Sequence, residues 1–367
     1  MLEEDDFNSL KECFDESWLG LGAKVYEFEK EWSSYFDNDC HSIACNSATA
    51  ALHIALLALE LPKGTEVIVP SLTFISSVNV ILYAGLVPVF ADINPNSLTI
   101  SIASITELIN KNTSAIIPVH YGGEPCEMDK IINIAKEYNL KVIEDCAHTQ
   151  GSFYKNKYLG YWGDIGCFSF EEKKGMTTGD GGMLVTSNKS IAEKAKRLRW
   201  LGINKDTWTR SNLFTKGNWY YEISELGFKY NMNNIAASLG LSQLKKLKRI
   251  NSNKSKIIKK YIETVNKLNY AKPLLPYSLI NNINSYWLFG LRTKFRDELM
   301  GFLNSKGIAT GMHFTPINEQ PLYNQSPYKT PIASSISKEL ITLPLSPGHT
   351  MEQIEYVCNN LKLFKIN

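Results

Sequence analysis

Short apolar runs alternate with segments of helical periodicity over the first two thirds of the chain. Several of these runs are apolar without a break, which is typical of strands covered on both faces of a sheet. The predicted strands are residues 66–70, 87–92, 115–119, 141–145 and 183–186. Strands that alternate with helices in this way predict an α/β fold with a mainly parallel sheet wrapped by helices.

The first strong helical pattern covers residues 50–61, whose apolar side chains share one broad face. Asn46 or Ser47 is expected to cap the first turn of this helix, because both side chains can accept hydrogen bonds from amides that have no partner within the helix. The helix is too short to span a membrane, which takes about 20 consecutive apolar residues.

A longer helix is predicted over residues 241–260, where eight lysines and arginines occur with no acidic residue. They stand beside an apolar stripe made of Leu241, Leu244, Leu247 and Ile250. We therefore expect the basic residues to form the solvated face of a helix that crosses between two domains, with a partner-binding patch as the alternative.

The change of pattern near residue 240 predicts two domains. Residues 1–240 are expected to form the large domain, and residues 241–367 a smaller C-terminal α+β domain. The smaller one is predicted to hold strands at 285–293 and 308–314 and a closing helix at 351–363.

Composition excludes several classes of protein. The 39 Lys and Arg residues nearly balance the 37 Asp and Glu residues, and a net charge of +2 argues against a dedicated nucleic-acid binder. The acidic start MLEEDDF does not resemble a signal peptide, so the expected location is cytoplasmic, with no membrane partner. The seven cysteines are scattered without a CxxC pair, which predicts reduced, packed thiols.

Candidate chemistry begins in the glycine-rich segment 166–182, GCFSFEEKKGMTTGDGG. Such a loop is either a tight turn or a place where backbone approaches a ligand closely. Lys173 and Lys174 lie between Ser169 and the glycine-rich run. Two exposed lysines on a turn are the simpler interpretation.

A second feature favours a site, because the predicted strand 141–145 ends in Glu144 and Asp145. Ligands of open α/β sheets collect at the carboxyl ends of strands, and adjacent side chains point to opposite faces, so only one of the two carboxylates can face a given site. Structural carboxylates that cap the next turn are the alternative. A buried aspartate can hold a protonated heteroaromatic nitrogen, and a desolvated lysine can form a Schiff base. These are the two groups that a pyridoxal phosphate enzyme requires.

The third feature is an anion site at residues 46–49, which open the helix 50–61. Unpaired amides at a helix start, together with small side chains, can bind a phosphate. The hydroxyl of Ser169 could add to it, and the aromatic face of Phe74 could stack on a ring.

Taken together, the motifs resemble the DegT/DnrJ group of nucleotide-sugar aminotransferases, which have the aspartate aminotransferase fold (fold type I) of pyridoxal phosphate enzymes. The resemblance runs over nearly the whole chain, through the segments ATAALHIALLAL, VIVPSLTF, PVFADI, VIEDCAH, FSFEEKKGMTTGDGG, GFKYNMNNIAASLGLSQL and GMHFTP. One departure is Asp180, where the family usually has Glu.

The resemblance assigns a role to each residue that matches a family motif. Its register selects Lys174, not Lys173, as the Schiff-base lysine, and Asp145 as the acid that binds the pyridine nitrogen. The other cofactor-binding positions that it implies are Phe74 as the stacking aromatic, His148 beside the ring hydroxyl, and Ala48, Thr49 and Ser169 around the phosphate.

The resemblance also implies a homodimer with shared active sites, because Asn231 matches a residue that contacts the phosphate bound in the neighbouring subunit. A helix cap is the alternative role for Asn231. For the sugar pocket it suggests residues 18–22, the aromatic segment 208–221 and His313. A core or interface role is the simpler interpretation of any one of these aromatic side chains.

The reaction implied is transfer of an amino group, from glutamate in the family, to a keto sugar carried on a nucleotide. Lysine at position 174 favours amino transfer, because relatives that remove a hydroxyl from the sugar carry His there. The alternatives are a dehydratase of the same fold and a regulator that binds cofactor without turnover. No metal is expected, since His41, His53, His120 and His349 lack ligand spacing.

Overall fold

The computed structural model describes residues 2–36, 39–211, 220–277 and 285–366. Its main feature is a seven-stranded sheet in the order β1 (His41–Cys45), β9 (Gly182–Thr186), β8 (Ile165–Ser169), β5 (Lys141–Asp145), β4 (Thr113–Ile116), β2 (Glu66–Pro70) and β3 (Val87–Ala91). Only β9 runs antiparallel to its neighbours in this sheet. The prediction of a mainly parallel sheet is confirmed.

Strand β4 ends earlier than the predicted segment 115–119. Pro118 has no N–H to donate, so the regular ladder cannot continue through it. Ile117 still donates to Ile68 O at 2.8 Å, and Val119 pairs with Asp145 through a single bridge. The extended chain therefore continues beyond β4 to the carboxyl end of β5.

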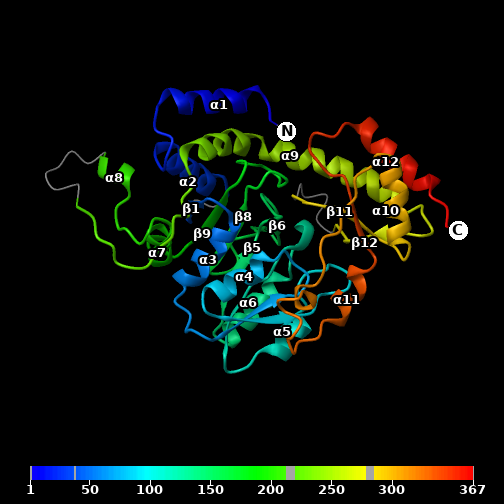
Figure 1. The fold of residues 1–367 in the computed structure, drawn as a ribbon, viewed down its shortest axis with the longest axis horizontal. Helices are drawn as coiled ribbons and strands as arrows, with labels where there is room; N and C mark the ends of the chain where they lie inside the picture. Colours follow the sequence, from blue (N-terminus) through cyan, green and yellow to red (C-terminus); the bar gives the residue numbers. More distant parts are fainter. Residues whose placement is uncertain (1, 37–38, 212–219, 278–284, 367) are drawn as a thin grey trace.

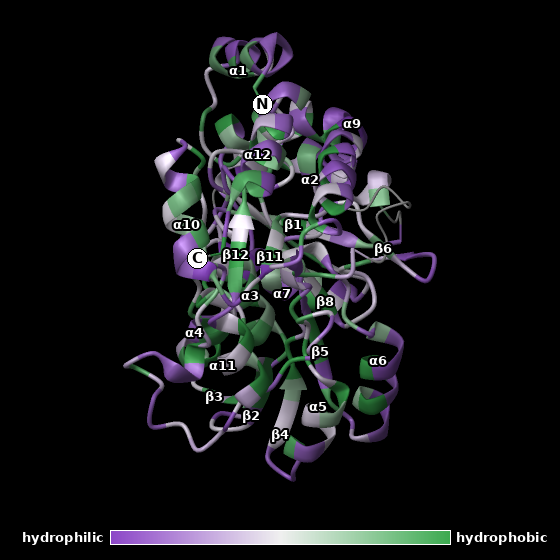
Figure 2. Cartoon of the chain, turned by 90° about the vertical axis from the view of Figure 1, so that its right-hand side faces the viewer, coloured by the Kyte–Doolittle hydropathy of each residue, from purple (hydrophilic) through white to green (hydrophobic). Residues whose placement is uncertain are grey.

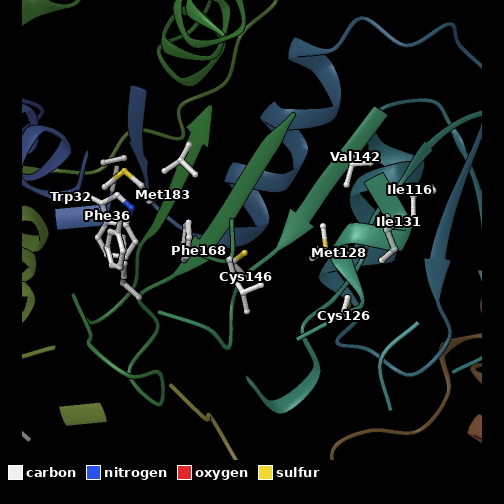
Figure 3. Close-up of a cluster of buried hydrophobic side chains, with 14 of the residues drawn as sticks. Trp32, Phe36, Ile116, Cys126, Met128, Ile131, Val142, Cys146, Phe168 and Met183 are labelled. Carbon is white, nitrogen blue, oxygen red and sulfur yellow. The ribbon is translucent and has the colours of Figure 1, made fainter. Parts of the chain in front are cut away.

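Helices cover both faces of the sheet (Figure 1). One face packs against α3 (Ala48–Ala58), α4 (Ser76–Tyr83) and α7 (Lys189–Arg199), and the other against α2 (Ala23–Phe36), α5 (Ile102–Leu108) and α6 (Met128–Glu137). Val67 and Val69 of β2 belong to the first core and Ile68 to the second, as the alternation of a strand dictates. Figure 3 shows the second core, with Trp32 and Phe36 beside Phe168.

Helix α9 (Asn234–Val265) is longer at both ends than the predicted helix 241–260. The Asn233 side chain caps it by accepting from Ala236 N at 2.9 Å. Its first half contributes Leu244 and Leu247 to the core beneath the large sheet, and its second half contributes Ile258 to the C-terminal core. The division at residue 240 stays a prediction, since this helix continues across it.

The basic residues of α9 do not all face solvent as predicted. Lys245, Lys248, Lys256 and Lys259 are exposed. Lys254 is 1% exposed, so the prediction is wrong for this residue, which the helix turns toward the core. Figure 2 shows hydrophilic and hydrophobic bands along α9 and α6, as expected of helices with one buried face.

The C-terminal part holds a small sheet, β10 (Lys272–Pro273), β11 (Phe289–Arg292) and β12 (Leu340–Leu343). Helices α10 (Arg296–Ser305), α11 (Pro331–Ser337) and α12 (Met351–Leu363) accompany it. The prediction of a strand at 308–314 is wrong. Gly311 alone pairs with Thr342 of β12, because the chain then turns so that the His313 and Phe314 rings pack around Trp287.

The remaining elements lie at the edges of the molecule: α1 (Glu4–Asp15) beside α9, the hairpin β6 (Phe153–Tyr154) and β7 (Lys157–Tyr158), and the short helix α8 (Thr207–Ser211). All seven cysteines lie in the described residues, are buried, and form no disulfide. No helix within the described ranges has the length and apolar character needed to cross a membrane.

Candidate active site

A cavity of about 400 Å³ opens at the carboxyl ends of the central strands. It gathers the start of α3, the segment before α4, the ends of β5 and β8, and side chains from the C-terminal part. Eight of the nine predicted site residues line it: Ala48, Thr49, Phe74, Asp145, His148, Ser169, Lys174 and His313. The roles assigned to them stay predictions.

Asp145 is the last residue of β5 and lies in the wall of the cavity, 5% exposed. Ser77 Oγ donates to its Oδ2 at 2.7 Å, and the Ala147 amide donates to its Oδ1 at 3.1 Å. Burial raises the pKa of Asp145, while these hydrogen bonds and the nearby Lys174 oppose the rise. A cationic group in the cavity would be the natural counter-charge for this carboxylate.

Glu144 faces the opposite side of the sheet, as the alternation predicted. Its oxygens accept from three backbone amides, those of Gly160 at 2.9 Å, Trp162 at 2.6 Å and Gly163 at 2.8 Å, and one lies 3.2 Å from His120 Nε2. The turn-capping interpretation is correct for this carboxylate.

His120, Glu144 and Cys146 place potential metal-ligand atoms within 4.8 Å of one another. These atoms already have partners that suit packing: His120 Nδ1 accepts from Cys126 N at 3.1 Å, and Glu144 is held by amides. Burial raises the pKa of the Cys146 thiol well above its ordinary value, so the sulfur stays protonated and is a poor ligand. This donor set does not favour a metal, and the expectation of no metal stays a prediction.

The two adjacent lysines differ in environment. Lys173 is exposed, whereas Lys174 is half-buried with its Nζ 4.1 Å from the centre of the Trp287 ring. Burial lowers the pKa of Lys174 to about 8, against the opposing effect of Glu171 and Asp145. A substantial neutral fraction of the Lys174 amine near neutral pH makes it the better nucleophile of the pair.

The anion site predicted at residues 46–49 has the geometry of a helix N-terminus. Ser47 caps α3 by accepting from Ala50 N at 3.1 Å, which leaves the amides of Ala48 and Thr49 without intrahelical acceptors. Thr49 Oγ1 lies 2.7 Å from Ser76 Oγ, and Ser169 Oγ lines the same cavity. Unpaired amides and hydroxyls together suit a phosphate.

The two cavity histidines are held in place by hydrogen bonds. His148 Nδ1 accepts from the Gly122 amide at 3.2 Å, so the neutral ring carries its proton on Nε2 and can donate. Burial, assisted by Lys174, holds the pKa of His148 well below its ordinary value. His313 Nδ1 lies 3.0 Å from Thr342 Oγ1, and burial lowers its pKa also.

Asn231 lies outside the cavity of its own chain. Its side chain donates to Met232 O at 3.0 Å, and its backbone pairs with Cys45 through an isolated bridge. The helix-cap alternative for Asn231 is wrong, because Asn233 caps α9. The contribution to a neighbouring subunit stays a prediction.

The segments suggested for the sugar do not line the cavity in the described residues. Trp18 Nε1 donates to Leu21 O at 2.9 Å, and the Trp18 ring meets Trp208 edge to face at 5.1 Å. Both contacts suit packing. Residues 212–219 of the aromatic segment 208–221 lie outside the described residues.

Three residues that shape the cavity carry no signal in the sequence that marks them as site residues. Ser77 holds Asp145, and Trp287 and Phe314 form the wall beside Lys174 and Phe74. Trp287 falls within the predicted strand 285–293, where nothing distinguishes it from a packing residue. The structure starts β11 only at Phe289, which frees Trp287 to enter the cavity.

The sequence is similar to those of known aminotransferases. The DegT/DnrJ/EryC1/StrS aminotransferase family matches residues 1–362. The chain is 35% identical over 359 residues to the GDP-perosamine synthase of Escherichia coli O157:H7, covering 97% of this chain and 94% of that enzyme.

Solved structures resemble the chain over nearly its full length. Helicobacter pylori PseC, an aminotransferase involved in the biosynthesis of pseudoaminic acid, matches with a TM-score of 0.91 at 26% identity, covering 99% of this chain and 96% of that chain. NtdA from Bacillus subtilis with bound cofactor PMP matches with a TM-score of 0.86 at 29% identity, covering 98% of this chain and 81% of that chain.

Proposed function

Since the chain belongs to the DegT/DnrJ/EryC1/StrS aminotransferase family, we propose that it transfers an amino group to a keto sugar carried on a nucleotide, with pyridoxal 5'-phosphate as cofactor. The relatives named as a GDP-perosamine synthase and as an enzyme of pseudoaminic acid biosynthesis support a role in making amino sugars. The match to PseC over 99% of the chain supports the fold of pyridoxal phosphate transferases of fold type I.

One observation carries the proposal: a single cavity brings together a buried carboxylate, a desolvated amine and an anion site. Asp145 suits a protonated ring nitrogen, the amides of Ala48 and Thr49 with the Ser169 hydroxyl suit a phosphate, and Lys174 suits an aldehyde. The donor set therefore fits pyridoxal phosphate. Phe74 is 54% exposed at the rim, where its ring contacts Phe314 and can also stack on the pyridine, and His148 can donate to the ring hydroxyl.

When bound, pyridoxal phosphate supplies an aldehyde for amines and a ring that takes up the electron pair released at the reacting carbon. The Asp145 carboxylate holds a proton on the ring nitrogen and so makes the ring a better acceptor. Lys174 Nζ acts as general base and acid. It removes a proton from the carbon that loses the amino group and delivers a proton to the carbon that gains the amino group. Its pKa of about 8 suits both directions of transfer near neutral pH.

The substrate details rest on the family resemblance. We propose glutamate as the amino donor, which leaves as 2-oxoglutarate, and a homodimer in which Asn231 contacts the phosphate site of the partner subunit. The position of Asn231 supports this, because it lies outside its own cavity, next to strand β1. His313 is proposed to contact the sugar from the C-terminal side of the cavity.

The test is an assay with purified protein, pyridoxal phosphate, glutamate and a panel of GDP-, UDP- and dTDP-linked keto sugars. We expect an amino sugar nucleotide and an equal amount of 2-oxoglutarate, both followed by mass spectrometry. Lys174→Ala should lower kcat by at least about 100-fold, because it removes the general base and acid. Lys173→Ala is the matched control and should stay within about twofold, since that side chain is exposed.

Two outcomes would contradict the proposal. Release of ammonia with a deoxygenated sugar would identify a dehydratase of the same fold. Cofactor bound at Lys174 without turnover of any keto sugar in the panel would identify a regulator. Borohydride labelling at Lys173 in place of Lys174 would overturn the choice of lysine but leave the reaction open to assay.

A further inference from the structure

Trp287 reaches the cavity from the C-terminal part of the chain, just before β11. It contacts the segments that follow two neighbouring central strands and carry the proposed chemistry, the residues after β5 and the turn after β8. The proposed reaction assigns it no part.

The first set of contacts links Trp287, Gly122 and His148 to one another. The Trp287 backbone amide donates to Gly122 O at 2.9 Å, and the Gly122 amide donates to His148 Nδ1 at 3.2 Å. The His148 ring then stacks on the Trp287 ring, with centroids 4.1 Å apart and planes at 3°. The His148 ring is therefore held by the Gly122 amide and by the Trp287 ring.

The second set of contacts fixes the lysine turn. Trp287 Nε1 donates to Lys173 O at 3.0 Å, which pins the peptide directly before Lys174. The face of the indole lies 4.1 Å from Lys174 Nζ. One side chain thus holds both the backbone and the amine of the proposed catalytic lysine.

Close approach at this point depends on the turn Tyr121–Gly123. Gly122 and Gly123 have φ of 63° and 103°, in the left-handed region that favours glycine. A Cβ on Gly123 would lie 2.5 Å from Ser285 O and 2.6 Å from Tyr286 Cα. The two glycines allow the segment that carries Trp287 to lie directly against the large domain.

No smaller side chain can make the whole set of contacts. Phenylalanine keeps a face for His148 and Lys174 but loses the donor to Lys173 O, and leucine loses both. A face contact with a partly desolvated ammonium is directional, so an aliphatic residue of similar bulk cannot replace it.

We infer that Trp287 is a positioning residue for the proposed aminotransferase reaction: it holds Lys174 and His148 in a common register, so that the lysine meets the cofactor aldehyde while His148 faces the ring hydroxyl. This inference rests on the proposed function. It predicts that the C-terminal part of the chain is needed to attach the cofactor at Lys174 as well as to bind sugar.

The test compares wild type with Trp287→Leu and Trp287→Phe by borohydride trapping of added pyridoxal phosphate, followed by peptide mass spectrometry. Trp287→Leu should lower the ratio of label on Lys174 to label on Lys173 by roughly 10-fold, because the indole that holds the Lys173 peptide and the Lys174 side chain in place is lost and misplaced reacting groups react more slowly. Trp287→Phe should retain the ratio to within about threefold, because the ring remains. The exposed Lys173 serves as an internal reference in every sample.

Trp200→Leu is the matched control, since Lys229 Nζ lies 3.3 Å above the Trp200 ring and Trp200 does not line the cavity. It should leave the labelling ratio unchanged. Melting curves set the temperature of all assays below the unfolding range of each variant. If Trp287→Leu does not fold, Trp287→Met takes its place with the same expected decrease, because its flexible side chain fills the space but offers no aromatic face.

The outcomes separate this inference from the proposed function. Wild-type labelling at Lys174 with an unchanged ratio in the aliphatic Trp287 variant would overturn the positioning role and leave the aminotransferase proposal intact. Absence of label at Lys174 in wild type would overturn the proposed function. In steady-state assays the positioning role lowers kcat more than it raises the KM for glutamate, whereas a role in substrate binding would do the reverse.

Discussion

Among the described residues, burial lowers the pKa of both Lys254 and Lys174 strongly. The pKa of each falls to about 8, but only Lys174 lines the cavity. Lys254 lies on α9 with 1% exposure, and no acidic side chain of the described residues opposes the effect of burial on its pKa. A buried ammonium of this kind costs stability, and the cost must be offset by the packing around it.

Replacing Lys254 by methionine should therefore stabilise the cofactor-free protein at pH 7. The depressed pKa corresponds to a penalty of up to about 3 kcal/mol, so we expect a gain of roughly 1–3 kcal/mol in the free energy of unfolding, measured with urea. Lys256→Met, on the exposed face of the same helix, should change stability by less than about 0.5 kcal/mol.

The pH dependence has a definite sign. Between pH 8 and the ordinary lysine value, Lys254 is neutral in the folded chain and protonated in the unfolded chain, so the unfolded state binds more protons. The stability of the wild type relative to Lys254→Met should therefore rise with pH through this window. The buried thiols and Lys174 titrate in both proteins, so their effects cancel in this difference. A difference that does not change with pH would contradict the assignment.

For individual residues, the sequence predicted the proposed reactive side chains better than the side chains that hold them in place. Alternation along β5 predicted that Asp145 and Glu144 face opposite sides, and the family resemblance selected Asp145. The greater burial of Lys174 agrees with the family register. Trp287 could not be found in the same way, because its contact with Lys173 joins residues 114 positions apart. No local periodicity records such a contact.

At several places in the fold, a glycine allows two elements to approach each other closely. Gly182 begins β9 and lies against the first turn of α3: a Cβ on it would come within 2.4 Å of the Ser47 carbonyl and 2.5 Å of Ala48 N. These are backbone atoms, which cannot turn aside. The anion site at the start of α3 is therefore set by the distance between this helix and β9.

Gly182→Ala should push α3 away from the sheet and lower the free energy of unfolding by about 2–4 kcal/mol. It should also weaken binding of pyridoxal phosphate, measured by absorbance titration, because the amides of Ala48 and Thr49 move with the helix. Gly301→Ala is the control: Gly301 lies in α10, where an added Cβ would meet nothing within 4 Å beyond the backbone of its own helix, and alanine should stabilise that helix by about 0.5–1 kcal/mol.

The sequence located elements well where burial alone determines them and poorly where distant contacts do. Residues 66–70 and 141–145 were predicted to the residue as β2 and β5, because both strands are covered on two faces. Residues 308–314 have an equally suitable composition, yet form no strand. The packing of His313 and Phe314 around Trp287 prevails there over the pairing with β12.

Over the whole molecule, α9 contributes to two cores, the one beneath the large sheet and the C-terminal one, which also includes Leu72, Ile93 and Tyr121 from segments that follow strands of the large sheet. Residues of its first half pack under the large sheet and residues of its second half pack in the C-terminal core. Figure 1 shows this helix running from one part of the molecule to the other. Disruption of either core therefore removes packing from the helix that serves the other, which favours cooperative unfolding.

The proposed sharing of active sites in a homodimer can be tested with hybrid dimers. If Asn231 serves the partner's site, Lys174→Ala and Asn231→Ala should each be nearly inactive alone. Unfolded and refolded together in equal amounts, they should regain about a quarter of wild-type activity, because half of the dimers are hybrids and each hybrid has one intact site. Sedimentation establishes the oligomeric state, and a mixture no more active than its parts would contradict sharing.

The burial of all seven cysteines gives the folded chain a chemical inertness that its composition does not suggest. Because burial raises the thiol pKa at Cys45, Cys126, Cys146, Cys167 and Cys358, alkylating and oxidising agents find no ready thiolate at these positions. Each sulfur becomes reactive only when its own surroundings open. The rate at which a small alkylating agent modifies each cysteine thus reports how often the structure opens locally around that residue, with no label introduced.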